Sequence, residues 1–296
     1  MRTPFRSSSM IACVLFALGC HAVPEESLTM TTSDAGAVKN GHLPVRGIRM
    51  YYEIHGDGGG VPLVLLHGGG STIDVTYGRV LPLFARHRTV IAVEEQGHGR
   101  TTDRDAPVRF DTSADDVAAL LGQLQVARAD IMGFSNGASV AMQLAIRHPA
   151  LVRKLVFASS MTKRSGAAPQ FWEFMARATF ADMPQPLKDA FLKVNPDPRK
   201  LRAMHDKDVE RMQHFVEIGD DDVRKVSAPT LILLGDRDVP TLEHAVELTH
   251  LLPHPHLIVL PGGHGEYLGE LVFAKAPSRA PGWTVGLIED FLDGAG

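Results

Sequence analysis

Gly133-Phe134-Ser135-Asn136-Gly137 follows an apolar run at residues 129–132 and precedes a helical pattern at residues 138–148. The sequence therefore predicts a strand, a sharp turn and a helix, with Ser135 at the apex of the turn. Glycines on both sides of such a serine let the strand and the helix approach closely, which exposes the hydroxyl at the carboxyl edge of the sheet. The first N–H groups of the helix point at the same place.

A serine placed in this way can attack an acyl carbon once a base removes its proton. A glycine-containing turn with an ordinary serine is the alternative, because so short a pattern also occurs by chance. The rest of the chain therefore has to supply a base near Ser135.

The composition indicates a globular protein. The chain has 296 residues, of which 44% are hydrophobic and 22% charged, and its formal net charge is −4. This suits one large domain, or one domain that carries an inserted lid. Nucleic acid is not an expected partner, because the sequence contains no basic run or stripe.

Residues 1–20 differ from the rest of the chain. Arg2 and Arg6 are followed by an apolar core at residues 10–19 that is too short for a stable membrane span, and small residues precede Cys20. The segment resembles a bacterial lipoprotein signal, in which Cys20 would be lipidated and become the new N-terminus. A plain secretory signal is the alternative, because Ala17 stands where lipoprotein signals usually have leucine. We therefore expect an exported protein, anchored to the bacterial cell envelope by its lipid, or else periplasmic or secreted.

Both cysteines, Cys13 and Cys20, lie in this signal-like segment. Cleavage at Cys20 would leave no thiol in the folded part, which excludes disulfides, a cysteine nucleophile and a cysteine metal site. Residues 21–41 are small and polar without a helical or strand period, and we expect a flexible tether there. The remaining residues, 42–296, are predicted to form the folded domain.

Strand and helix patterns alternate through this domain. A hairpin is predicted at residues 45–54, and buried strands at residues 62–66, 89–93, 129–132, 154–158, 230–234 and 257–260. Helices are predicted at residues 77–86, 115–124, 138–148, 242–252 and 283–292, the second of them capped by Thr112 or Ser113. This alternation favours an α/β fold with a mostly parallel, doubly wound sheet.

The alternation is interrupted at about residues 160–226. This region has helical patterns but no buried strand, and it is rich in aromatic and methionine side chains: Phe171, Trp172, Phe174, Met175, Phe180, Met183, Phe191 and Met212. We expect an inserted helical cap. Most of these side chains would form the core of the cap, and some of them could also face a substrate.

Titratable side chains follow the last two predicted strands, in Gly235-Asp236-Arg237-Asp238 and in Pro261-Gly262-Gly263-His264-Gly265. Because the carboxyl ends of parallel strands share one edge of a sheet, we expect an acid and His264 to meet Ser135 there. An imidazole can take the serine proton, and a carboxylate can hold the imidazole tautomer and offset its developing charge. Both Asp236 and Asp238 are candidates for this carboxylate.

Taken in order, these motifs resemble the α/β-hydrolase superfamily. The resemblance covers about residues 45–292 and rests on the turn at Ser135, on the two segments just quoted, and on two further turns, His67-Gly68-Gly69-Gly70 and Gly97-His98-Gly99-Arg100-Thr101. It implies the α/β-hydrolase fold with a serine nucleophile. It also implies an enzyme that needs no cofactor.

The resemblance assigns roles to individual residues. It implies that Ser135 is the nucleophile, His264 the base and Asp238 the acid, because the acid of the family falls three residues after the glycine. The backbone N–H groups of Gly69 and Asn136 would form the oxyanion hole, where one donor is typically worth about 3 kcal/mol of barrier.

Several other polar residues have simpler interpretations. The family uses histidines such as His67 and His98 mostly to support loops, and Glu95 and Gln96 stand where it usually has Asp and Arg. The remaining histidine group is expected to lie at a solvated rim: His250, His254 and His256. We expect no metal site there, because no H-E-x-x-H motif or carboxylate cluster accompanies these histidines.

The leading hypothesis is a serine hydrolase that cleaves a carboxylic ester or related acyl bond of a small molecule. Aminopeptidase, lactonase, C–C hydrolase and haloperoxidase chemistry on the same triad are alternatives, as is a binding protein without catalysis. The apolar cap favours an uncharged or hydrophobic acyl group. An aminopeptidase would need cap carboxylates to hold the substrate amine, and four are available that also fit solvated helix faces: Asp182, Asp206, Asp208 and Glu210.

Overall fold

The computed structural model describes residues 38–274 and 277–294. The predicted signal segment with Cys20, and the predicted tether up to residue 37, lie outside these residues. No helix in the described part of the chain is both long and apolar enough to cross a membrane.

An eight-stranded sheet organises the fold, with the strand order β1-β2-β4-β3-β5-β6-β7-β8. The strands are β1 (Lys39–Val45), β2 (Ile48–His55), β3 (Leu63–Leu66), β4 (Val90–Val93), β5 (Ala129–Phe134), β6 (Val152–Ala158), β7 (Thr230–Gly235) and β8 (Pro255–Leu260). Only the pairs β1–β2 and β2–β4 are antiparallel, and the other five are parallel. The predicted mostly parallel sheet is therefore confirmed.

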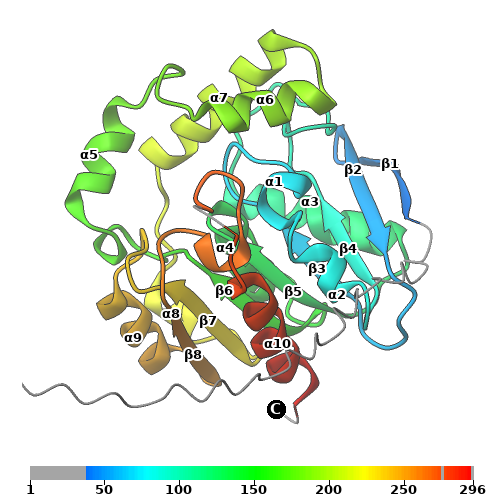
Figure 1. The fold of residues 1–296 in the computed structure, drawn as a ribbon, viewed down its shortest axis with the longest axis vertical. Coiled ribbons are helices and arrows are strands. Elements are labelled where there is room, and N and C mark those ends of the chain that lie inside the picture. The colour runs from blue at the N-terminus through cyan, green and yellow to red at the C-terminus, as the bar shows by residue number, and fades with distance from the viewer. Residues whose placement is uncertain (1–37, 275–276, 295–296) are drawn as a thin grey trace, which may run out of the picture. The chain divides into compact units, whose positions relative to one another are not determined.

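Helices cover both faces of this sheet (Figure 1). The helices are α1 (Ile73–Tyr77), α2 (Leu81–Phe84), α3 (Phe110–Gln123), α4 (Asn136–Arg147), α5 (Pro169–Arg177), α6 (Gln185–Val194), α7 (Pro198–Gln213), α8 (Asp220–Val223), α9 (Leu242–Leu251) and α10 (Ala280–Asp293). Side chains from α3, α4 and α9 pack on one face, and side chains from α1, α2 and α10 pack on the other. The sheet is thus doubly wound.

The central strands β3 and β4 are apolar throughout because both of their faces are buried. In β3, Val64 and Leu66 belong to the cluster under α3 and α4, whereas Leu63 and Leu65 belong to the cluster under α2 and α10. All four side chains are fully buried. The continuous apolar runs in the sequence therefore predict the strands well.

Helices α5 to α8 lie in the range predicted to form an inserted cap, between β6 and β7. In Figure 1, α5, α6 and α7 lie above the strands, on the side away from α10. A small separate core holds this insert together, formed by Met183, Phe191, Leu201 and Met204 with Phe180, Leu187 and Leu192 packed against it.

Three local predictions were wrong. In place of the predicted helix at residues 77–86, α1 ends at Tyr77 with Gly78 as its C-cap residue, and the separate short helix α2 follows with Pro82 in its first turn. Helix α3 begins at Phe110, with Arg109 as its N-cap residue rather than Thr112 or Ser113. Strand β1 begins at Lys39, so it includes the last three residues of the predicted tether.

Candidate active site

Ser135 occupies a strained turn between β5 and α4. Its φ of 55° and ψ of −121° lie in a region that L residues rarely adopt. The glycines on either side are required for steric reasons: a Cβ on Gly133 would collide with the backbone of Gly137, and a Cβ on Gly137 would collide with the carbonyl groups of Leu66 and His67. The close approach that exposes Ser135 therefore depends on both glycines.

We expect Gly137→Ala to lower the unfolding free energy by about 3 kcal/mol or more, because the new methyl group meets backbone atoms that cannot move aside. Gly122→Ala is the matched control, since a Cβ at this helical position has open space; we expect it to add about 0.5 kcal/mol. Urea unfolding of both variants checks this. Equal stability of the two variants would contradict the steric account of the turn.

The structure brings Ser135, His264 and Asp238 together at the carboxyl edge of the sheet. Nε2 of His264 lies 3.1 Å from Oγ of Ser135, and Nδ1 of His264 lies 2.6 Å from Oδ1 of Asp238. Because a carboxylate can only accept, Nδ1 carries the proton and Nε2 is free to accept the serine proton. Asp236 instead accepts the N–H of Gly262 and pairs with Arg237, so it supports the turn before His264.

The environment of Asp238 keeps it ionised. Its side chain is fully buried, and it accepts hydrogen bonds from Ser159 Oγ and from the N–H groups of Gly235 and Val239. Burial alone would raise its pKa, but the hydrogen bond and the charge of His264, together with these donors, hold the pKa below its usual value. Asp238 can therefore stabilise an imidazolium on His264.

Sequence reasoning missed Ser159, which directly follows β6 and has a φ of 52°. Its hydroxyl donates to Oδ2 of Asp238 at 2.5 Å and lies 2.5 Å from the hydroxyl of Tyr267, so Ser159 holds the carboxylate from behind and Tyr267 supports Ser159. Its position after a strand at the same edge of the sheet was the only signal in the sequence.

We expect Ser159→Ala to lower kcat for an ester about tenfold, since losing one hydrogen bond to a charged group costs about 1.5 kcal/mol. Alanine makes the same backbone demand as serine here, but Asp238 and Tyr267 each lose a buried hydrogen-bond partner, so the melting temperature should fall by a few degrees. Steady-state kinetics checks this, and a kcat within twofold of the wild type would show that Asp238 does not need this donor.

The turn His67-Gly68-Gly69-Gly70 packs against Ser135. A Cβ on Gly68 would touch the ring of Phe134, and a Cβ on Gly69 would run into the side-chain amide of Asn136. The N–H of Gly68 donates to Thr76, and the N–H of Gly70 donates to Asp208. Among the described residues, the N–H groups of Gly69 and Asn136 have no hydrogen-bond partner, so both predicted oxyanion donors are free to bind a ligand.

A cavity of about 340 Å³ lies beside Ser135 and His264. Its apolar wall comes from the insert and from the segments that follow β7 and β8: Met161, Phe171, Phe174, Met175, Met183, Leu187, Val209, Met212, Phe215, Val239, Val272 and Phe273. His264 is held between two of the rings that border it, with centroids 4.7 Å from Phe134 and 5.4 Å from Phe273. Several side chains of the insert thus face the candidate nucleophile.

Glu270 also lines this cavity and was missed by the sequence analysis. One of its oxygens accepts the N–H groups of Val272 and Phe273. Burial raises the pKa of this carboxyl, although these hydrogen bonds and the nearby His264 oppose the shift. Glu270 therefore holds the segment that carries Phe273 against His264.

A buried network of charges lies behind the glycine turn. Asp208 of α7 contacts His98, and Arg211 of α7 contacts both Asp208 and Glu95. Asp208 thus does not lie on a solvated helix face, which corrects one of the simpler interpretations. Asp206 does lie on such a face, where it pairs with Arg202.

The two histidines predicted to support loops do so. His67 binds the carbonyl of Gly68 through Nδ1 and accepts the N–H of Glu95 at Nε2. Burial lowers the pKa of His67 to about 4, so it is neutral. Burial also acts against a charge on His98, but the Asp208 carboxylate raises the pKa of His98.

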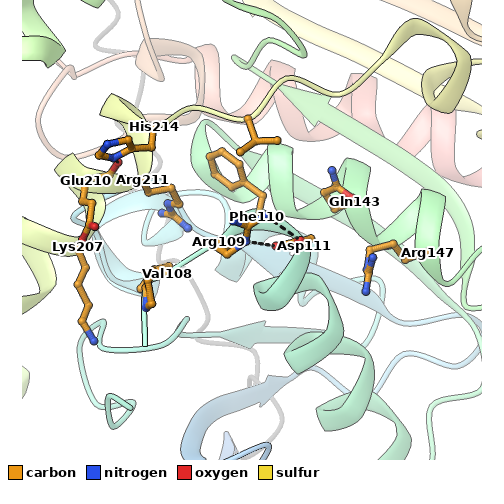
Figure 2. A pocket seen from close by; sticks show the side chains of 12 residues that line it. Val108, Arg109, Phe110, Asp111, Gln143, Arg147, Lys207, Glu210, Arg211 and His214 are labelled. Atoms are coloured by element: carbon orange, nitrogen blue, oxygen red, sulfur yellow. Dashed lines mark hydrogen bonds and ion pairs between the residues drawn. The ribbon is translucent and has the colours of Figure 1, made fainter. Parts of the chain in front are cut away.

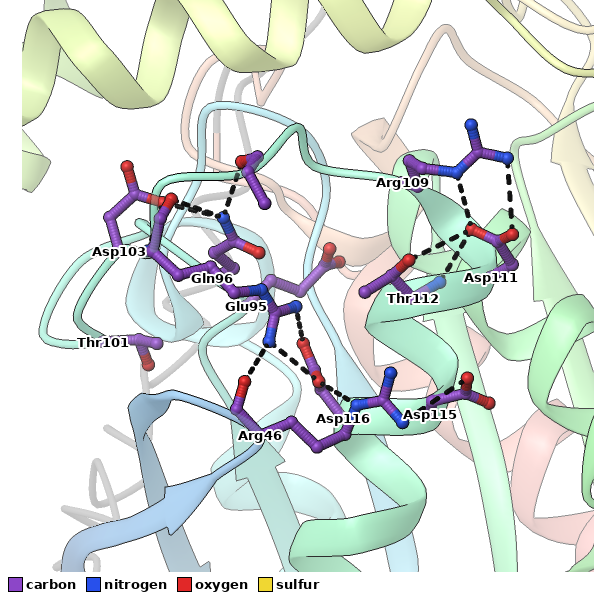
Figure 3. Close-up of polar contacts among 12 residues, drawn as sticks. Arg46, Glu95, Gln96, Thr101, Asp103, Arg109, Asp111, Thr112, Asp115 and Asp116 are labelled. Carbon is purple, nitrogen blue, oxygen red and sulfur yellow. Dashed lines mark hydrogen bonds and ion pairs between the residues drawn. The ribbon is translucent and has the colours of Figure 1, made fainter.

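The two residues that depart from the family pattern are engaged in the same loops. Glu95 binds Arg211 at 3.1 Å. Figure 3 shows Gln96 donating its side-chain amide to Asp103, at 2.8 Å. Gln96 therefore braces the loop after β4, and none of its hydrogen bonds among the described residues reaches the triad.

A second cavity of about 300 Å³ lies between the start of α3 and the end of α7 (Figure 2). It contains none of the predicted site residues. Three of the cations around it have acidic partners: Arg109 pairs with Asp111, Arg147 with Asp115, and Lys207 with Asp103.

Within residues 38–274 and 277–294, no group of three or more His, Cys, Asp or Glu side chains is arranged to hold a metal ion.

Comparison with known proteins gives the family context. Residues 61–199 match the family model described as the alpha/beta hydrolase fold. The chain is 30% identical over 236 residues to an AB hydrolase superfamily protein, YisY, of Bacillus subtilis, covering 72% of this chain and 88% of that protein. It is 37% identical over 117 residues to a 2-hydroxymuconate semialdehyde hydrolase of a Pseudomonas species, covering 38% of this chain and 41% of that enzyme.

The aligned region spans less than half the length of the first three curated relatives, at 41%, 44% and 47% of their chains. Among solved structures, one described as an N-acyl homoserine lactone degrading enzyme superposes with a TM-score of 0.65 at 27% identity, covering 85% of this chain and 100% of that one. An enol-lactonase from Burkholderia xenovorans superposes with a TM-score of 0.67 at 19% identity, covering 86% and 100%, and shows a shared fold.

Proposed function

The chain belongs to the α/β-hydrolase superfamily, and we propose that it is a serine hydrolase that cleaves a carboxylic ester or related acyl bond of a small molecule through an acyl-enzyme. One observation carries this proposal: Ser135, His264 and Asp238 form a continuous hydrogen-bonded series with contacts of 3.1 and 2.6 Å. This is the arrangement of an activated serine nucleophile.

In the first half of the reaction, Nε2 of His264 removes the hydroxyl proton of Ser135 while Oγ attacks the acyl carbon. The ionised Asp238 holds the Nδ1–H tautomer and stabilises the imidazolium that forms. His264 then gives the proton to the leaving alkoxide. The products of this half are an alcohol and an ester on Ser135.

The tetrahedral intermediate carries a negative oxygen that needs donors. The N–H groups of Gly69 and Asn136 are suited to this role, because they flank Ser135 and have no partner among the described residues. Asn136 also opens α4, so the positive end of the helix dipole lies behind its N–H. In related sites the loss of one such donor lowers kcat about 10²–10³-fold.

In the second half, water takes the place of the alcohol. His264 removes a proton from this water, which attacks the acyl carbon, and the imidazolium returns its proton to Oγ of Ser135. The acid product leaves and the enzyme returns to its starting state. No metal or cofactor takes part in these steps.

We propose that α5, α6 and α7 act as a cap that shapes the acyl site. The cavity beside Ser135 is lined mainly by Met, Phe, Leu and Val side chains, several of them from this insert. Such a wall favours an uncharged or hydrophobic acyl group, since a charged group would lose its hydration there without a partner.

A lactone is the second candidate substrate, because a lactone is a cyclic ester and opens by the same steps. The similarity to a structure described as an N-acyl homoserine lactone degrading enzyme, over the full length of that chain, favours this candidate. Hydrolysis of a semialdehyde has a similar basis in the name of the Pseudomonas relative, over a shorter alignment.

Aminopeptidase activity has less support. Among the four cap carboxylates that could hold an amine, only Asp182 and Asp208 line the cavity. Both oxygens of Asp208 already have partners. Oδ2 of Asp182 accepts two hydrogen bonds from Thr179.

A substrate panel tests the proposed specificity. We expect p-nitrophenyl esters of short and medium acyl chains, and acyl lactones, to be hydrolysed at least a hundredfold faster than aminoacyl p-nitroanilides. The Ser135→Ala variant provides the background rate. Faster cleavage of the anilides would replace the esterase proposal with an aminopeptidase.

We propose that the protein is exported and anchored to the cell envelope by lipid on Cys20. Cys20→Ser should then move the protein from the membrane fraction to the soluble fraction of an expressing bacterium. Immunoblotting of the two fractions checks this, with Cys13→Ser as the control. An unchanged distribution would exclude lipid attachment at this residue.

A further inference from the structure

Asp208 joins the insert to the glycine turn beside Ser135. It lies on α7, 138 positions along the chain from Gly70, and its Oδ2 accepts the N–H of Gly70 at 2.6 Å. The same oxygen lies 2.9 Å from Nε2 of His98, and Oδ1 accepts Nη2 of Arg211 at 2.6 Å. A single carboxylate of the insert thus contacts both of the loops that follow β3 and β4.

This contact restricts the backbone that carries the predicted oxyanion donor. Three successive glycines have few steric preferences of their own, so outside contacts must fix their conformation. Gly70 has a φ of 63°, and its N–H shares a peptide plane with the carbonyl of Gly69. Because Asp208 holds that plane, it fixes one side of Gly69. The side chain of Asn136 packs against Gly69 from the direction of α4.

The contact also makes the N–H groups of Gly69 and Gly70 different in their availability to a ligand. The N–H of Gly70 is occupied by Asp208, whereas the N–H of Gly69 has no partner among the described residues. If Asp208 released Gly70, the N–H of Gly70 could turn toward the cavity. The preceding Gly68–Gly69 peptide, which carries the N–H of Gly69, would then also be free to rotate. The orientation that leaves Gly69 available is therefore tied to the presence of α7.

The surroundings of Asp208 keep its position fixed. Burial alone would raise its pKa, but Arg211 and His98 hold the pKa of this carboxyl well below its usual value, so it remains an anion. Arg211 is in turn held by Glu95 at 3.1 Å and stacks with its guanidinium carbon 4.7 Å from the centroid of the Phe110 ring. The carboxylate cannot move without disturbing several buried contacts.

Stability alone is a weak reason for this network. Bringing several charges out of water costs about as much as their attraction returns. In addition, Nε of Arg211 and Oε1 of Glu95 are buried and have no hydrogen-bond partner within the described part of the chain. Because two of its atoms lack partners, the network is better explained by a function than by stability: through Asp208, it orients the glycine turn.

We propose that Asp208 is a positioning residue: it holds the Gly69–Gly70 peptide so that the Gly69 N–H faces the oxyanion, and it makes a complete oxyanion hole depend on a docked insert. This inference rests on the proposed serine hydrolase function. It adds a requirement that the triad alone does not contain, namely that the cap contributes to kcat through α7 as well as to substrate binding.

The test compares the full-length wild type with Asp208→Asn, Asp208→Leu and Asp206→Asn. Leucine is similar in size and cannot accept a hydrogen bond, whereas asparagine keeps one acceptor oxygen. Asp206 is the matched control, because it lies on the same helix with its side chain 49% exposed and contacts Arg202 and its neighbour His205, but not the glycine turn. Each variant is assayed for kcat and KM with a p-nitrophenyl ester and for its melting temperature.

We expect Asp208→Leu to lower kcat about a hundredfold with KM changed less than threefold, as for the loss of an oxyanion donor. Asp208→Asn should recover part of that loss, and Asp206→Asn should match the wild type. A second readout uses two ketones of the same chain length. The inhibition constant of a trifluoromethyl ketone, which forms a tetrahedral oxyanion on serine, should rise with the loss of kcat, while that of the methyl ketone stays constant.

Other outcomes overturn the proposal. A raised KM with an unchanged kcat would make Asp208 part of the substrate wall, and unchanged inhibition by the trifluoromethyl ketone would show that the oxyanion hole does not depend on it. If Asp208→Leu does not fold, the Asp208→Asn comparison decides by the same criteria. If the wild type hydrolyses esters no faster than Ser135→Ala does, the proposed function is refuted, and this inference with it.

Discussion

Ser135→Ala is expected to lower kcat for a p-nitrophenyl ester by about 10⁶, as the loss of the nucleophile does in serine hydrolases with the same three groups. Oγ of Ser135 is the atom that would form the acyl bond, and no second hydroxyl lies within hydrogen-bond distance of Nε2 of His264 among the described residues. Alanine fits the space of serine, so KM and the melting temperature should stay close to those of the wild type.

The matched control for this variant is Ser113→Ala. Ser113 is a buried serine on α3 that lines neither cavity, and its removal should leave kcat within about twofold of the wild type. Stopped assays with enough enzyme to detect a millionth of the normal rate are needed. A kcat for Ser135→Ala above one-tenth of the wild-type value would show that the ester is cleaved by another group.

Asp238→Asn is expected to lower kcat by about 10⁴, with a small change in KM. An amide at this position can donate to Nδ1 of His264, which favours the wrong tautomer and removes the charge that stabilises the imidazolium. The buried position of Asp238 and its contact of 2.6 Å with His264 make this effect large.

Asp236→Asn separates the two carboxylates between which the sequence leaves a choice. Asp236 accepts the N–H of Gly262 through one oxygen, and asparagine can make the same hydrogen bond. We therefore expect kcat to stay within about threefold of the wild type. Equal losses in the two variants would mean that the charge of the whole segment matters, and that Asp238 has no special role.

The sequence predicts those parts of the fold that have a local physical signature. The strands that support the site are apolar on both faces, and residues 230–234 and 154–158 were recognised from this alone and lie in β7 and β6. The turn at Ser135 is equally local, because glycines two residues apart from the serine on each side are a steric requirement of the turn. The mostly parallel order of the strands follows from their alternation with helices.

The predicted helix boundaries were wrong where two local signals in the sequence favour different ends of a helix. Residues 77–86 have helical spacing, but α1 already ends at Tyr77, and only Leu81–Phe84 form a second short helix, α2, with Pro82 in its first turn. Thr112 and Ser113 are good capping residues, yet α3 begins earlier, so that Phe110 is buried with the first turn. In Figure 3, Thr112 donates to Asp111 inside that turn.

The contacts behind the site were not predictable from a single sequence. Asp208 reaches Gly70 across 138 positions, and Ser159 reaches Asp238 across 79. Neither pair belongs to a motif, and an aspartate with charged neighbours on a helix has the pattern of a solvated face. Only the folded arrangement separates Asp208, which is buried against the glycine turn, from Asp206, which is exposed two residues away.

The most direct test of the central claim is to treat the wild-type protein with a fluorophosphonate and to locate the adduct by peptide mass spectrometry. We expect one phosphonyl group per chain, attached to Ser135, and a much slower reaction in Asp238→Asn. An unmodified Ser135 after long incubation, or an adduct on another residue with Ser135 intact, would contradict the central claim.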